Sequence, residues 1–114
     1  MNAVSTVAQL LASRCESRKH QSPLSPDAVA RQLQALPGWS SRGNAIEREF
    51  TFPDYRRTIA FVNAVADLAE NEDHHPELTV GYGKVRVSYG THDVGGISMN
   101  DFICAAKTDA IYAP

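Results

Sequence analysis

The fold is decided by the stretch from residue 51 to residue 89, which has the sequence TFPDYRRTIAFVNAVADLAENEDHHPELTVGYGKVRVSY. Its first half predicts a long helix that ends near residues 70–71, because apolar side chains recur at helical spacing. These side chains are Ile59, Val62, Val65, Ala66 and Ala69. Thr51 and Asp54 have the spacing of a capping box and Pro53 suits a first turn, so we place the start of the helix there.

The second half of the stretch predicts a β-hairpin. Its strands occupy residues 78–80 and 84–89, joined by a glycine-rich turn at residues 81–83. In the longer strand every second residue is apolar: Val85, Val87 and Tyr89. This is the period of a strand with one buried face, so we expect the hairpin to lie against a core.

Upstream of this stretch, the sequence predicts a short helix and a second hairpin. Ser25 can cap the helix, and Pro26 suits its first position. Residues 39–42 and 45–52 predict two strands, joined by a tight turn at Gly43-Asn44.

Downstream, Ser98 and Asp101 have the spacing of a capping box, which predicts the start of a last helix. The inner face of this helix is predicted to hold Phe102, Ile103, Ala106 and Ala110. The complete order of elements is therefore αββαββα. Two antiparallel hairpins with interleaved helices predict an α+β fold, in which a four-stranded antiparallel sheet has its helices packed on one face.

With 114 residues, the chain is long enough for one domain with a single core. We assign this domain to residues 24–114. Residues 1–23 are polar and irregular, and we expect them to form a flexible or loosely docked N-terminal arm. Two cysteines, Cys15 and Cys104, are too few for a disulfide framework and are expected to be free thiols in a reducing compartment.

The composition is that of an ordinary globular protein, 43% hydrophobic and 21% charged. The formal charge is −2 and the basic residues are scattered, so direct nucleic-acid binding is disfavoured. We find no apolar run long enough to span a bilayer and no secretory signal, so we expect a cytoplasmic protein without a membrane partner.

The long helix carries more apolar surface than one packing face requires, because Phe61 and Leu68 widen its stripe. Packing against the sheet and also against a second subunit would account for this surface. We therefore expect a homo-oligomer, either a homodimer or a homotetramer.

Three of the four histidines fall between positions 74 and 92. His74 and His75 lie in the turn after the long helix, and His92 lies just past the last strand. If the second hairpin folds back beside the long helix, both loci reach the same end of the sheet. Carboxylates accompany them: Glu70, Asp73 and Asp101. Imidazoles give and take protons at neutral pH, so such a cluster can run an elimination without a metal or nucleotide.

The spacing alone leaves other interpretations open. A histidine pair in a loop is commonly a solvated surface, and the same groups could hold a metal. Zinc sites favour a pair spaced along a helix or a Cys/His set, and adjacent histidines rarely face one ion, so no metal ligands are predicted. Asp101 alone fits a helix cap, and it can also be a site residue.

A more specific indication comes from the intervals between Glu70, His74-His75-Pro76, Tyr82, His92 and Asp101. They resemble the signature of pterin-4a-carbinolamine dehydratases, also known as dimerisation cofactors of a homeodomain transcription factor. The resemblance extends over about residues 24–112. It includes Pro-Gly-Trp at residues 37–39, Phe-x-Asp-Tyr at residues 52–55 and Thr91-His92. The order αββαββα is also that of the family.

The resemblance implies the site residues. The positions that match catalytic histidines are His74, His75 and His92. Those that match positions around the pterin are Glu70, Asp73, Thr91 and Asp101. The sequence departs from the pattern at Leu78, where some relatives carry Trp, and this puts the affinity for the substrate in doubt rather than the reaction.

The resemblance also implies an activity. The enzyme would remove water from a 4a-hydroxytetrahydropterin to give quinonoid dihydropterin by histidine acid–base catalysis. It would need no cofactor of its own, because the pterin is the substrate. It would recycle the pterin cofactor of aromatic-amino-acid hydroxylases, with phenylalanine hydroxylase as a functional partner. The alternative that the family supplies is an interaction and dimerisation module that acts as a transcriptional coactivator.

Overall fold

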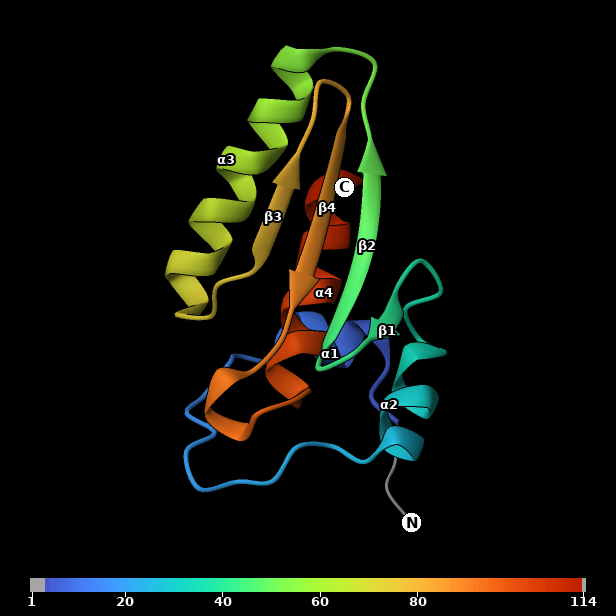
Figure 1. The fold of residues 1–114 in the computed structure, drawn as a ribbon, viewed down its shortest axis with the longest axis vertical. Helices are drawn as coiled ribbons and strands as arrows, with labels where there is room; N and C mark the ends of the chain where they lie inside the picture. Colours follow the sequence, from blue (N-terminus) through green and yellow to red (C-terminus); the bar gives the residue numbers. More distant parts are fainter. Residues whose placement is uncertain (1–3, 114) are drawn as a thin grey trace.

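The computed structural model describes residues 4–113, which contain one antiparallel sheet in the strand order β1-β2-β4-β3 (Figure 1). The strands are β1 Ser40–Arg42, β2 Ala45–Thr51, β3 Glu77–Val80 and β4 Lys84–Tyr89. The helices are α1 Val7–Ala12, α2 Pro26–Leu33, α3 Tyr55–Glu72 and α4 Met99–Tyr112, with a 3₁₀ turn, η1, at His92–Val94. The predicted α+β class is confirmed, and so is the order αββαββα from α2 to α4.

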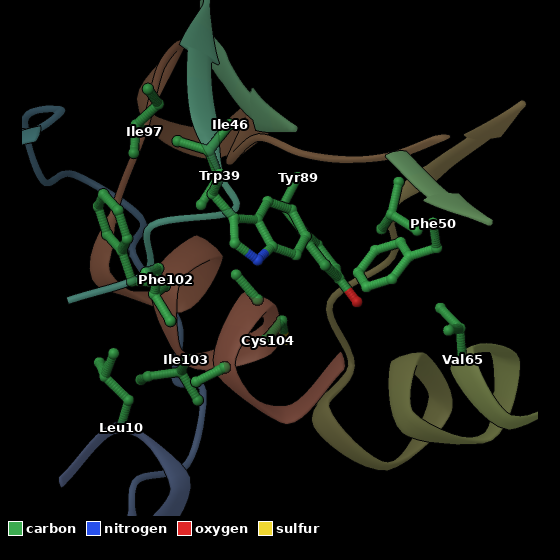
Figure 2. Close-up of a cluster of buried hydrophobic side chains, with 14 of the residues drawn as sticks. Leu10, Trp39, Ile46, Phe50, Val65, Tyr89, Ile97, Phe102, Ile103 and Cys104 are labelled. Atoms are coloured by element: carbon green, nitrogen blue, oxygen red, sulfur yellow. The ribbon is translucent and has the colours of Figure 1, made fainter. Parts of the chain in front are cut away.

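The core lies between one face of the sheet and the helices α3 and α4 (Figure 2). Alternate residues of the central strands point into it, among them Phe50 of β2 and Val87 of β4. Val65 of α3 and Phe102 of α4 belong to the same buried cluster. The helices therefore pack on one face of the sheet, as predicted.

The start of α3 differs from the prediction. Its N-cap is Asp54, whose carboxylate accepts a hydrogen bond from the backbone N–H of Arg57 at 2.8 Å. The predicted capping box at Thr51 and Asp54 is wrong, because Thr51 is the last residue of β2 and pairs there with Lys84. With 18 residues, α3 is the longest described helix, and no helix within residues 4–113 is long and apolar enough to cross a membrane.

The last turn of α4 also differs. Ala110, predicted to be on the inner face, is exposed, whereas Phe102, Ile103 and Ala106 are buried as predicted. The turn presents Asp109 to the sheet instead. Its Oδ1 accepts hydrogen bonds from Trp39 Nε1 at 2.9 Å and from Arg48 Nη1 at 2.7 Å. These two polar partners decide which side of the last turn faces inward.

The predicted oligomer face must be revised at Phe61. Its side chain is only 5% exposed and packs within the same chain against Phe50 and Phe52, with ring centroids 4.8 and 5.0 Å away. Phe61 therefore serves the core of one subunit and is not available to a second one. Leu68 is partly exposed.

The N-terminal region contains a helix that the sequence did not predict. α1 is capped by Thr6 and buries Leu10 in the core next to α4. After α1, residues 13–21 cross the molecule without forming a helix or strand, and we call them the N-terminal strap. The division of the chain at residue 23 stays a prediction, and residues 1–3 lie outside the described part.

Hydrogen bonds to α3 and α4 hold the strap, and the three shortest are these. Lys107 Nζ donates to the Ser13 carbonyl at 2.7 Å, the Cys15 N–H donates to Glu72 Oε1 at 2.8 Å, and Asn100 Nδ2 donates to the Glu16 carbonyl at 2.7 Å. Burial raises the pKa of Glu72, but its hydrogen bonds from Lys107 and the Cys15 backbone outweigh burial and hold the pKa below its ordinary value.

Candidate active site

The end of α3 positions the first histidine locus. Asp73 closes the helix in the left-handed conformation, with φ of 50°, and its backbone N–H bonds back to the carbonyls of Ala69 and Glu70. The N–H of His74 also donates to the Ala69 carbonyl, at 3.1 Å. The chain therefore reverses sharply, and His74 and His75 leave the helix in the turn before β3.

Antiparallel pairing brings the second locus to the first. Glu77 pairs with Ser88, so the start of β3 lies beside the end of β4. From β4 the chain runs directly into η1, which begins at His92. The turn before β3 and the segment after β4 therefore meet at one end of the sheet.

His74 is held by a buried carboxylate. Its Nε2 lies 2.6 Å from Asp101 Oδ1, and the Asp101 side chain is 0% exposed. The other oxygen, Oδ2, accepts hydrogen bonds from Thr91 Oγ1 and from the Ser98 N–H, both at 2.9 Å. The bond to Ser98 completes the predicted capping box of α4, which is confirmed. The Asp101 carboxylate thus caps the N-terminus of α4 and also holds the His74 imidazole. The His74 ring stacks on Tyr89 as well.

His75 has a different environment. Its Nε2 lies 2.6 Å from Glu70 Oε2, but the two side chains are 55% and 76% exposed. A hydrogen bond between such exposed groups is weak and can exchange with water. His75 is therefore oriented by Glu70, but it is free to turn towards a ligand.

A cavity of about 530 Å³ lies between the two histidine loci. Its lining includes the three predicted catalytic histidines, which are His74, His75 and His92. Asp73 and Thr91 also line it. A second cavity, of about 360 Å³, adjoins it and shares His75, Thr91 and His92. A volume of several hundred cubic ångströms suits a small-molecule ligand.

Two predicted site residues do not line this cavity. Glu70 is an exposed residue hydrogen bonded to His75, and Asp101 is a buried residue hydrogen bonded to His74. Their geometry favours orientation of the imidazoles over contact with a ligand. Among residues 4–113, no group of three His, Cys, Asp or Glu side chains is arranged to hold a metal ion.

The sequence did not reveal one wall of the cavity. That wall belongs to the N-terminal strap and to residues near its anchors: Cys15, Glu16, Ser17, Arg18, Lys19, Glu72 and Asn100. The strap reaches the site through contacts with residues 57 to 94 positions away. No local pattern indicates such contacts, although Arg18 and Lys19 are a basic pair in an otherwise polar segment.

Most of the chain matches a known protein family. The family model described as pterin 4 alpha carbinolamine dehydratase matches residues 22–111. The chain belongs to this family. The histidine loci and the Asp101 carboxylate are thus parts of a pterin dehydratase fold rather than an isolated surface cluster.

Bacterial relatives of the family are similar over most of their length. A protein of Nitrosospira multiformis is 51% identical over 90 residues, which cover 79% of this chain and 80% of the relative. A protein of Xylella fastidiosa strain 9a5c is 48% identical over 114 residues, covering 98% and 97%. Both are named "Putative pterin-4-alpha-carbinolamine dehydratase".

Solved structures agree with this assignment. A transcriptional coactivator/pterin dehydratase from Brucella melitensis is 34% identical, with a TM-score of 0.77 over 81% of this chain and all of that one. A pterin dehydratase-like RuBisCO assembly factor of the alpha-carboxysome shares the fold alone, at 24% identity and a TM-score of 0.56 over 66% of this chain and 87% of that one.

Proposed function

We propose that the protein removes water from a 4a-hydroxytetrahydropterin and releases quinonoid dihydropterin. The proposal rests on family membership and on one observation, the convergence of three imidazoles from two distant loci on one cavity. The pterin is the substrate, so no bound cofactor is required. Physiologically the reaction would recycle the pterin cofactor of aromatic-amino-acid hydroxylases, phenylalanine hydroxylase among them.

The reaction needs two proton transfers. The substrate carries a hydroxyl on a ring carbon next to a ring nitrogen. A general acid gives a proton to the hydroxyl, the carbon–oxygen bond breaks, and water leaves. A general base takes the proton from the nitrogen, and the nitrogen–carbon double bond forms. Neutral and protonated imidazoles suit both roles near neutral pH.

We assign the proton transfers to His75 and His92. Both line the two adjoining cavities, so a ligand that spans the junction lies between them. His74 is held rigidly by Asp101 and its side chain is only 11% exposed, which suits binding and orientation of the pterin ring. Asp73 and Thr91 line the same cavity and are proposed to bind the substrate, whereas Glu70 and Asp101 orient the imidazoles.

A coupled assay tests this function. An aromatic-amino-acid hydroxylase generates the hydroxylated pterin, and the appearance of quinonoid dihydropterin is followed by absorbance with and without the purified protein. We expect the wild-type protein to accelerate the dehydration. The rate with H75A and the rate with H92A should each be at least ~10-fold lower, because a general acid or base contributes ~10²–10⁴-fold.

The matched control is H20N, which removes the fourth histidine. His20 is exposed, does not line the cavity and has a positive φ of 67°, a conformation that asparagine tolerates. H20N should keep the wild-type rate. Absence of acceleration by the wild-type protein, or wild-type rates in both H75A and H92A, would refute the proposal.

A role as a transcriptional coactivator is the second candidate function, because the solved relative from Brucella melitensis is described as a transcriptional coactivator as well as a pterin dehydratase. It predicts a stable complex with another protein and no effect in the coupled assay. In either case we propose a homodimer or homotetramer in the cytoplasm, and sedimentation showing a monomer at micromolar concentration would exclude the oligomer.

A further inference from the structure

The two cysteines of the chain meet across the edge of the candidate active site. Cys15 of the strap and Cys104 of α4 are 89 positions apart, yet their Sγ atoms lie 3.4 Å from each other. Cys104 is completely buried at the centre of the core view in Figure 2. Cys15 is partly exposed and lines the cavity that holds the three histidines.

We propose that Cys15 and Cys104 form a reversible thiol oxidation site, at which a peroxide converts the pair to a disulfide that fastens the N-terminal strap to α4. The proposal does not depend on the ligand of the cavity. It depends on the contact between the two sulfurs and on the difference in accessibility between them.

The accessibility decides which sulfur reacts first. The hydrogen bond with Cys15, together with burial, raises the pKa of the Cys104 thiol, so Cys104 stays protonated in the core. Cys15 is partly exposed and lines the cavity, so a small oxidant can approach it from there. Its sulfur attacks the peroxide, the O–O bond breaks, and Cys15 becomes a sulfenic acid while one water is released.

The second step closes the bridge. The Cys104 sulfur displaces the hydroxyl from Cys15, the S–S bond forms, and the proton of the thiol leaves with the hydroxyl as a second water. In total two thiols lose two electrons and two protons, and one peroxide becomes two waters. A thiol reductant reverses the change.

The geometry requires only a small movement. A disulfide has a sulfur–sulfur distance of about 2.05 Å, so the two sulfurs must approach by about 1.4 Å. Cys104 is fixed in the middle of α4, whereas Cys15 lies in a part of the strap that belongs to no helix or strand. The strap can therefore make the movement without disturbing the core.

The bridge would change how the strap behaves. In the reduced protein the strap is held by hydrogen bonds, which can open without unfolding the domain. A covalent bond at Cys15 prevents this opening. Since residues 15–19 are one wall of the cavity, oxidation would fix that wall in place.

The test is a titration of the native full-length protein with hydrogen peroxide. We expect the chain to lose about 2 Da as both thiols disappear, peptide mapping to link Cys15 to Cys104, and dithiothreitol to restore both thiols. Trypsin cleavage after Arg14, whose side chain is 75% exposed, should become several-fold slower in the oxidised form and recover on reduction.

The control variants are C15S and C104A. Neither should lose 2 Da or gain protection from trypsin, and C15S gives the comparison even if C104A, at a buried site, folds poorly. Three results would overturn the proposal: an overoxidised Cys15 beside a free Cys104, a bridge between two chains, or an internal bridge that leaves cleavage at Arg14 unchanged.

Discussion

Replacement of Asp101 by asparagine tests the link between the last helix and the first histidine locus. The side chain is completely buried and accepts from three partners, namely His74, Thr91 and the Ser98 N–H. Asparagine keeps the shape but turns one acceptor oxygen into a donor and removes the charge. A hydrogen bond to a charged group contributes about 1.5–3 kcal/mol, so D101N should lower the free energy of unfolding by about 2–3 kcal/mol.

The measurement is urea unfolding followed by circular dichroism at fixed protein concentration, with a thermal scan in parallel. For a chain of this size the loss corresponds to a decrease in Tm of roughly 10 °C. The matched control is D93N, because Asp93 lines the same cavity but is exposed, and its replacement should change the free energy of unfolding by less than about 0.5 kcal/mol.

A double-mutant cycle isolates the contact with His74. If the 2.6 Å hydrogen bond stabilises the fold, the effects of D101N and H74Q should fall short of additivity by about 1 kcal/mol. Strict additivity, or a loss in D101N no greater than in D93N, would show that the carboxylate does not hold the imidazole.

Two further predictions concern stability. The pKa of Glu72 is below its ordinary value in the folded state, so its stabilising effect is present above the ordinary pKa and is lost as the pH falls through the folded value. E72Q should therefore be less stable than wild type at pH 7, and in unfolding titrations the difference should shrink as the pH falls below the ordinary pKa and vanish below the folded pKa. An added Cβ at Gly83 would lie 2.9 Å from the Phe52 carbonyl, so G83A should cost about 1–3 kcal/mol in urea unfolding. At Gly81 the nearest such atom is 3.8 Å away, so G81A should be almost neutral, and equal losses in both variants would contradict this reasoning.

The sequence predicted the elements that periodic patterns and capping residues determine. Ser25 and Ser98 predicted the starts of α2 and α4, and the alternation at residues 84–89 predicted both limits of β4. Errors arose where a tertiary contact outweighed a local pattern. Thr51 is engaged in the sheet instead of capping α3, and Asp109, not Ala110, faces inward because Trp39 and Arg48 bind it.

The candidate site was predictable only in part. The histidine intervals and the order of elements predicted that His74, His75 and His92 lie close together, and the structure places them on one cavity. The helix α1 was missed because it is only six residues long and depends on Leu10 docking beside α4 rather than on its own propensity. The strap that follows it forms no helix or strand that a periodic pattern could predict. Its contacts with the site join opposite ends of the chain, which no local pattern reports.

The strand order has a consequence for how the chain folds. The two central strands, β2 and β4, come from different hairpins, and the pair Ile46–Tyr89 encloses the whole of α3. Neither half of the chain can complete the sheet by itself, so fragments cut between β2 and α3 should remain unstructured until they are mixed. Closing this long loop early is costly in entropy, and the pairing of β2 with β4 should therefore limit the folding rate.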